Sequence, residues 1–220
     1  SLSIESEDAI TVHKVAEGGE APHGAAKFTK ITITPDKYMV NVPITREMIE
    51  DSQFAVIQIN AEAVGYALAK NEDSYIESVL SAGAGNTVSL TGGTLGYSDI
   101  TEGMRYLEAN GFTPSVMVIA PSLAEDIRNI DSFVEADKAG VTDPSKRLIG
   151  RIFGMNVIVS DNLTADTGYI IDPDHAFVIA EKRPITLEKV NDFFRDMQHV
   201  VASQRFGAAV LKANAICKLA

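Results

Sequence analysis

The sequence predicts an α+β fold, in which one long helix lies between two groups of strands. Three observations carry this prediction. Alternating apolar residues over 27–44 are typical of strands, steps of three and four over 46–81 are typical of a helix, and short apolar runs over 114–180 are typical of buried strands. Because 45% of the 220 residues are hydrophobic, the chain can form a sizeable core.

The first group of strands is expected to form a hairpin that begins at residue 27. Residues 27–34 and 38–44 both alternate between apolar and polar side chains. The four residues 34–37 between them suit a tight turn, because Pro35 fixes the backbone angle at the second position. An isolated hairpin is at best marginally stable in water, so this one needs a partner surface. A further short strand is expected at 9–15.

The helical pattern begins after Thr45, a plausible N-cap followed by acidic residues that suit the helix dipole. No proline interrupts residues 46–81, which predicts one continuous helix of roughly 50 Å at about 1.5 Å per residue. Gly65 and Asn71 are the positions at which we expect this helix to bend or break.

The region from residue 98 to 184 predicts a mixed sheet with helices. A helix is expected to open at 99–102 and to end at Gly111, and the run 114–121 predicts a strand buried on both faces. Three more short strands follow before residue 183. Beyond it, residues 185–190 predict another strand and 200–219 a long extended segment that Gly207 interrupts with a bulge or bend.

Sequence motifs for catalysis are missing. The chain contains no Gly-x-Ser-x-Gly, His-Glu-x-x-His, Cys-x-x-Cys or Gly-x-Gly-x-x-Gly, so no catalytic residue, cofactor or metal site is expected. Asp172, Asp174 and His175 either bind a divalent cation or form a turn around Pro173, and we favour the turn. The single cysteine, Cys217, is expected as a small core residue.

The formal net charge of −11 argues against a nucleic-acid-binding surface, which needs clustered Lys and Arg. An acidic protein can nevertheless enclose a genome without adsorbing to it. No apolar run is long enough to span a bilayer and no signal peptide is visible, so no membrane partner is expected. Since residue 1 is serine, we expect a processed or trimmed chain.

Four stretches in order resemble the major capsid proteins of tailed phages with the Hong Kong 97-type fold. Residues 40–80 ("VNVPITREMIEDS…") are similar to the passage from the family's extended loop into its spine helix. Residues 114–130 ("PSVMVIAPSLAEDIRNI") resemble the strand and helix of its axial domain. The stretches 148–163 ("LIGRIFGMNVIVSDNL") and 176–219 ("AFVIAEKRPIT…") resemble a later axial strand and the return to the peripheral domain.

The resemblance implies an extended loop at 1–44, built as a β-hairpin arm. It implies a peripheral domain at 45–97 and 185–220 that contains the spine helix, and a mixed-sheet axial domain at 98–184. It further implies pentamers and hexamers of this chain that assemble in the host cytoplasm into the icosahedral shell of a virion. That shell would enclose double-stranded DNA without sequence-specific binding. Scaffolding, portal and decoration proteins would be further partners.

A shell subunit gives the hairpin at 27–44 a partner, because another copy of the chain can cover its apolar face. The side chains expected at this intersubunit contact are Phe28, Ile31, Ile33, Tyr38 and Val40. Two alternatives remain open at this point. One is an encapsulin-type nanocompartment shell that encloses a cargo enzyme, and the other is a monomeric enzyme or binding protein with an α/β core.

Overall fold

Three separate sheets organise the described residues of the computed structural model, which are 2–7, 14–15, 17, 20, 28–52, 54–129 and 148–220. The strands are β1 (Leu2–Glu7), β2 (Phe28–Ile33), β3 (Asp36–Thr45), β4 (Asn86–Val88), β5 (Val116–Ile119), β6 (Leu148–Ile152), β7 (Met155–Val159), β8 (Gly168–Ile171), β9 (Phe177–Asp192), β10 (Met197–Val210) and β11 (Ile216–Leu219). The helices are α1 (Arg46–Asp51), α2 (Val56–Gly83), α3 (Tyr97–Ala109) and α4 (Pro121–Asn129), with short 3-10 turns η1 (Thr91–Gly93) and η3 (Ala213–Ala215).

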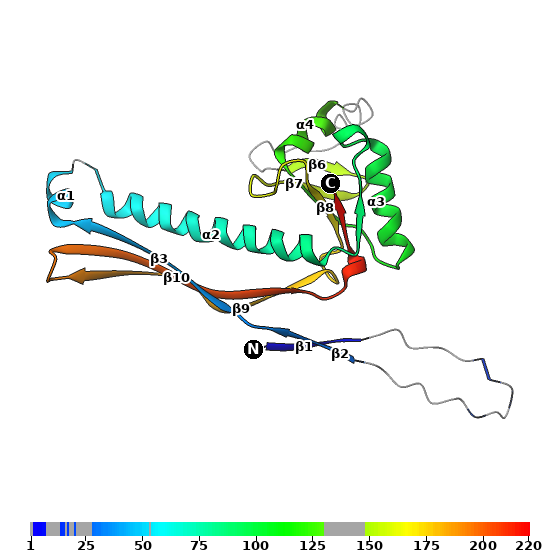
Figure 1. Ribbon diagram of the computed structural model, residues 1–220, viewed down its shortest axis with the longest axis horizontal. Coiled ribbons are helices and arrows are strands. Elements are labelled where there is room, and N and C mark those ends of the chain that lie inside the picture. The colour runs from blue at the N-terminus through cyan, green and yellow to red at the C-terminus, as the bar shows by residue number, and fades with distance from the viewer. Residues whose placement is uncertain are drawn as a thin grey trace.

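The sheets have different shapes and neighbours. The strand orders are β1-β2, β3-β10-β9 and β4-β11-β8-β5-β7-β6. The six-stranded sheet lies with α3 and α4 in a rounded lobe, and the three-stranded sheet lies along α2 in an elongated lobe (Figure 1). The β1-β2 ribbon extends away from the elongated lobe as a third part (Figure 1). The strand expected at 9–15 lies almost wholly outside the described residues.

The expected hairpin between 27–34 and 38–44 is wrong, although both segments are strands. β2 pairs antiparallel with β1, and β3 pairs antiparallel with β10. The alternation of β3 reflects its fit to β10 and α2, since Val42 lies opposite Val200 and Val40 opposite Ala202. Thr34 and Pro35 therefore connect two sheets. The residue types of this turn could not reveal that each strand pairs with a more distant segment of the chain.

The expected continuous helix over 46–81 is also wrong, because the chain leaves helical geometry at Ser52. The Ser52 hydroxyl accepts a hydrogen bond from the Phe54 N–H at 3.1 Å, and such local side-chain bonds compete with helix formation. α2 then runs for 28 residues, or about 42 Å at 1.5 Å per residue. It passes through Gly65 and Asn71 without interruption, so neither predicted weak point breaks it.

The elongated lobe has its own small core between α2 and the three-stranded sheet. Val64 and Leu68 of α2 pack with Ala202 of β10 and with apolar residues of β3. Nearby, the buried Gln204 of β10 donates from Nε2 to Glu72 Oε2 of α2 at 2.7 Å. α2 is therefore fixed to the central strand by apolar packing and by a polar contact.

Two edge strands of the three-stranded sheet contain proline. Pro43 lies in β3 and Pro184 in β9, both at the outside of the strand order. Proline lacks the N–H that an inner strand must donate, so these positions suit edge strands. The two strands expected before and after Arg183-Pro184 are consequently one 16-residue strand, β9.

At Gly207, where the sequence predicts a bulge or bend, the backbone of β10 lies very close to residues 33–35. A Cβ at this position would lie 3.1 Å from Ile33 Cγ2, 3.1 Å from the Thr34 carbonyl oxygen and 3.2 Å from Pro35 Cα. The absent side chain lets the chain pass from β2 to β3 directly over β10. The pairing of β10 with β9 shifts register just before this point, between Ser203 and Phe206.

β5 of the six-stranded sheet packs on both faces, as the apolar run at 114–121 predicts, with one face fully buried and the other half-buried. Met117 and Ile119 of β5 face a cluster with α3 and α4, and Val118 lies on the other side in a cluster with Leu80 of α2. Gly111, with φ of 82°, follows the end of α3 in the left-handed conformation that glycine favours. α2 therefore contributes side chains to the cores of both lobes.

Hydrogen bonds also join the end of α2 to the rounded lobe. Asn162 Nδ2 donates to Asp73 Oδ2 at 2.8 Å, and Thr164 Oγ1 donates to Glu77 Oε1 at 2.9 Å. Lys218 Nζ of β11 donates to Ser81 Oγ at 3.1 Å. These contacts set the angle at which the two lobes meet. No helix among the described residues is long and apolar enough to cross a membrane.

Candidate assembly surfaces

The five side chains expected at a subunit contact occupy different environments. Ile33 is only 2% exposed, and Tyr38 and Val40 pack against the core formed by α2 and β10. Ile31 is half-buried, and the side chain of Phe28 lies outside the described part of the chain. Three of the five are thus packed inside their own subunit, and a contact of this region with a neighbour stays a prediction.

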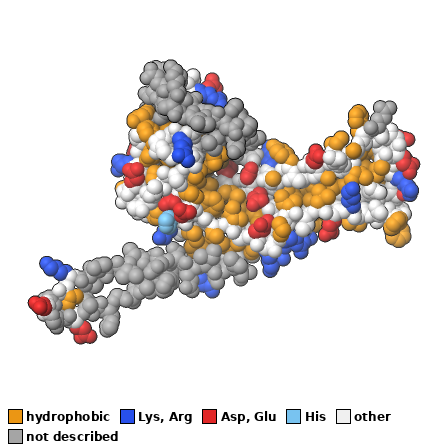
Figure 2. All heavy atoms as spheres, turned by 180° about the vertical axis from the view of Figure 1, so that it is seen from behind, with side chains coloured by type: hydrophobic (Ala, Val, Ile, Leu, Met, Phe, Trp, Pro, Cys, Tyr) orange, Lys and Arg blue, Asp and Glu red, His pale blue; other side chains and the backbone are white. Residues whose placement is uncertain are grey.

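The largest exposed apolar side chains of the described residues lie elsewhere, at the far end of the elongated lobe. Phe193 and Phe194, in the turn between β9 and β10, are 88% and 101% exposed, and Phe54 before α2 is 75% exposed. Hydrophobic side chains also continue along the elongated lobe in the view from behind (Figure 2). Sequence reasoning missed the turn, although the signal was present: "DFFRD" places two adjacent aromatic residues among charged ones.

The turn that carries these phenylalanines, residues 192–197, is here called the tip. Asp192 Oδ1 accepts a hydrogen bond from the Phe194 N–H at 3.0 Å. Asp196 has φ of 49° and its carbonyl oxygen accepts from the Arg46 N–H at 3.1 Å. The Arg46 Nη1 also lies 3.2 Å from Asp196 Oδ1. The tip is therefore fixed to the start of α1.

Arg46 joins the tip to α1 by a second ion pair, since its Nε lies 3.1 Å from Glu50 Oε1. Hydrogen bonds first to Asp196 and then to Glu50 raise the pKa of the Arg46 guanidinium above its ordinary value. Exposed ion pairs of this kind contribute little to stability individually. Their role here is geometric, because they fix the tip relative to the helix that follows β3.

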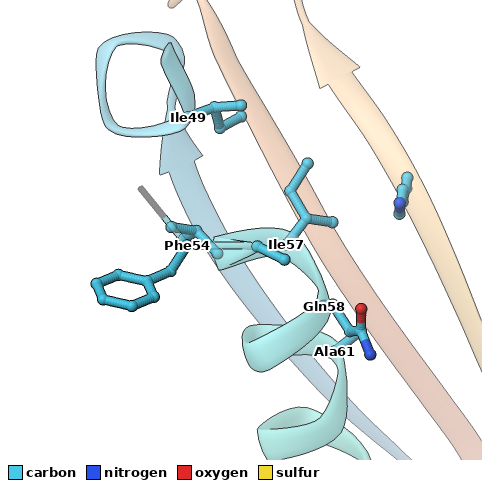
Figure 3. A pocket seen from close by; sticks show the side chains of 8 residues that line it. Ile49, Phe54, Ile57, Gln58 and Ala61 are labelled. Atoms are coloured by element: carbon cyan, nitrogen blue, oxygen red, sulfur yellow. The ribbon is translucent and has the colours of Figure 1, made fainter. Parts of the chain in front are cut away.

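An open groove of about 490 Å³ lies at the same end of the lobe, between the beginning of α2 and the strands. Ile49 of α1 and Ile57 and Ala61 of α2 border it, while the ring of Phe54 projects outward beside it (Figure 3). Lys189 of β9 supplies a positive charge to the lining. This predominantly apolar hollow, here called the α1–α2 groove, contains no catalytic group.

Asp172, Asp174 and His175 form a turn held by hydrogen bonds. Asp172 is buried and its carboxylate accepts from the N–H groups of Thr113 at 3.3 Å and Asp174 at 3.2 Å. His175 Nδ1 lies 3.0 Å from Asp172 Oδ2. In the described ranges, no three His, Cys, Asp or Glu side chains are grouped as metal ligands would be.

Cys217 lies fully buried in β11, within the core of the rounded lobe. Burial raises the pKa of its thiol to about 11, and a weak contact from Asn86 opposes this shift. A thiol with so high a pKa is a poor nucleophile at neutral pH. The cysteine is therefore part of the packing.

This thiol predicts a pH dependence of stability. Because its pKa is raised from 9.0 to about 11 in the folded chain, folding favours the neutral thiol. Its contribution is fully present below pH 9.0 and is lost as the pH rises toward 11, since the unfolded chain ionises first. Urea unfolding at several pH values should show this loss for the natural chain. The Cys217→Ala variant should lack that component, and identical pH profiles for both proteins would contradict the prediction.

Comparison with known proteins gives two consistent results. A family model described as phage capsid protein matches residues 29–219. A structure from Mycobacterium phage Che8 aligns with 99% of this chain and 83% of its own, with 19% sequence identity and a TM-score of 0.74. A comparison with curated proteins finds no match.

Two further solved structures have the same fold. A structure of the capsid of cyanophage P-SCSP1u has 14% sequence identity and a TM-score of 0.73, and the alignment covers 99% of this chain and 81% of the phage chain. The mature capsid of bacteriophage PhiM1 is 15% identical, with the same coverages of 99% and 81% and a TM-score of 0.74. The fold is the Hong Kong 97-type fold that the sequence resemblance implied. Together with the match over residues 29–219, this means that the chain belongs to the phage capsid protein family and is a structural major capsid protein of the virion.

Proposed function

We propose that copies of this chain form the pentamers and hexamers of an icosahedral shell that encloses double-stranded DNA. The observation that carries the proposal is the apolar surface at the end of the elongated lobe, where the residues Phe193 and Phe194 are almost fully exposed. A large exposed apolar surface is typical of an interaction site. The net charge of −11 supports a container that does not adsorb to the DNA it holds.

The proposal includes assembly in the host cytoplasm, with scaffolding, portal and decoration proteins as partners. These elements rest on membership of the capsid family. In this proposal the chain has a structural role and no catalytic activity. The proposed subunit has three parts, which are the arm at 1–44, the axial domain at 98–184 and the peripheral domain at 45–97 and 185–220.

Sheet pairing favours a refinement of these boundaries. β3 pairs with β10, which supports assigning 36–45 to the peripheral part. β4 and β11 belong to the six-stranded sheet, which supports assigning 86–88 and 216–219 to the axial part. Among the five side chains expected at a subunit contact, Phe28 and Ile31 on β2 are the ones we propose for a neighbour, because Ile33, Tyr38 and Val40 have packing partners in their own chain.

The experiment is to purify the protein, separate it by size-exclusion chromatography and image it by negative-stain electron microscopy. We expect capsomer rings or closed shells, and particles isolated from virions should contain nuclease-protected DNA. A stable monomer of 23.6 kDa under all conditions would contradict assembly. Shells filled with a cargo protein in place of DNA would contradict the proposed content and indicate a nanocompartment.

A further inference from the structure

The tip formed by residues 192–197 has the properties of a prebuilt contact. Phe193 and Phe194 are adjacent and almost fully exposed, so they gain little packing from their own subunit. Aromatic side chains contribute strongly to interfaces because they bury a large area with few rotatable bonds. Two of them at the end of a hairpin are unfavourable in water unless another surface covers them.

The tip is also held in one geometry before any contact forms. Asp192 Oδ1 accepts from the Phe194 N–H inside the turn, and Arg46 holds Asp196 through its N–H and its guanidinium. A surface that is already ordered loses less conformational entropy when it binds. The phenylalanines are therefore presented by a fixed turn.

The α1–α2 groove offers a matching hollow. Its volume of about 490 Å³ falls within the range of about 300–1,000 Å³ that holds drug-sized molecules, so it has room for phenyl rings. Ile49, Ile57 and Ala61 give it an apolar lining (Figure 3). None of its lining residues comes from the tip of the same subunit, and both phenylalanines of that tip are exposed to solvent.

Charges beside the two surfaces are complementary. Arg195 follows the phenylalanines on the tip, and it is exposed. Glu47 and Asp51 are exposed on α1, the helix that contributes Ile49 to the groove. Lys189 lines the groove, and Asp192 begins the tip. An incoming tip can thus pair Arg195 with the acidic residues of α1 and Asp192 with Lys189.

We propose that the Phe193–Phe194 tip of one copy docks in the α1–α2 groove of a neighbouring copy. The contact is heterologous, because the tip and groove are different surfaces of one chain, and such contacts close into rings when the rotation between copies permits. The inference rests on the proposed assembly into a shell and names one of the contacts that would hold it together.

The test compares assembly of three variants that each change only exposed residues. Phe193→Ser with Phe194→Ser removes both aromatic rings of the tip. Phe54→Ser removes an exposed aromatic ring at the edge of the groove, and Tyr66→Ser removes an exposed aromatic ring of α2 outside both surfaces. Thermal unfolding of unassembled subunits checks that all three fold like the natural chain. Particle yield is measured by sedimentation and electron microscopy at matched protein concentrations.

We expect the tip and groove variants each to lower the association constant about tenfold or more, which corresponds to about 1.4 kcal/mol per contact. Tyr66→Ser should assemble like the natural chain. Normal assembly of the tip variant would overturn the proposal, and so would loss of assembly for the tip variant alone with a normal Phe54→Ser variant. Failure of the natural chain to assemble would instead contradict the proposed function.

Discussion

Phe206→Ala should lower the free energy of unfolding by about 3–5 kcal/mol, the range for truncating a buried phenylalanine. Phe206 is fully buried where β10 passes under α2. Its ring centroid lies 4.9 Å from that of Tyr38 and 5.3 Å from that of Tyr75. The substitution would leave a cavity between β3, β10 and α2, which small shifts of these long elements cannot fill.

Urea unfolding of unassembled subunits, followed by circular dichroism, measures this loss. Phe194→Ala is the matched control, because it removes the same ring from the turn between β9 and β10, at a position that is 101% exposed. It should change the free energy of unfolding by less than about 0.5 kcal/mol. Equal effects of the two substitutions would show that the aromatic cluster does not hold the elongated lobe together.

Ile33→Lys should cost the folded subunit more than about 3 kcal/mol, since it removes a buried apolar side chain and places an ammonium group there. Ile33 is 2% exposed and its Cγ2 lies directly beside Gly207. The substitution therefore acts on folding.

Thr32→Lys provides the control for Ile33→Lys. Thr32 is the preceding residue of β2 and is exposed, so its lysine can remain in water. We expect a melting temperature close to that of the natural chain for Thr32→Lys and a much lower one for Ile33→Lys. A stable Ile33→Lys subunit that fails to assemble would restore the interpretation of Ile33 as a contact with a neighbour.

Local sequence patterns predicted the secondary structure better than the pairing of strands. The alternation of Tyr38, Val40 and Val42 correctly predicted a strand with one apolar face. It could not identify β10 as the partner, because that strand lies about 160 residues further along the chain. Hydrophobic alternation shows which face of a strand is buried but does not show which strand pairs with it. The turn at Pro35 looked like a local reversal for the same reason.

The helix shows a different limit of sequence reasoning. Apolar spacing located α2 and its buried face, including Val64 and Leu68. The spacing did not reveal the break at Ser52, where the side-chain hydroxyl forms local hydrogen bonds with the backbone of Phe54. The candidate assembly surface was missed because exposure depends on three-dimensional packing. "DFFRD" lies between two segments that the sequence predicts as extended, and its letters do not show that both phenylalanines lie outside the core.

The position of β10 and β11 has a consequence for protein synthesis. β10 is the inner strand of the three-stranded sheet, and β11 lies between β4 and β8 in the six-stranded sheet. Until the ribosome has made residues 197–219, β3 and β9 have no strand between them and β8 lacks one of its neighbours. We expect nascent chains to remain unable to offer a finished lobe to other copies. Assembly would then begin only from subunits whose translation has passed this segment.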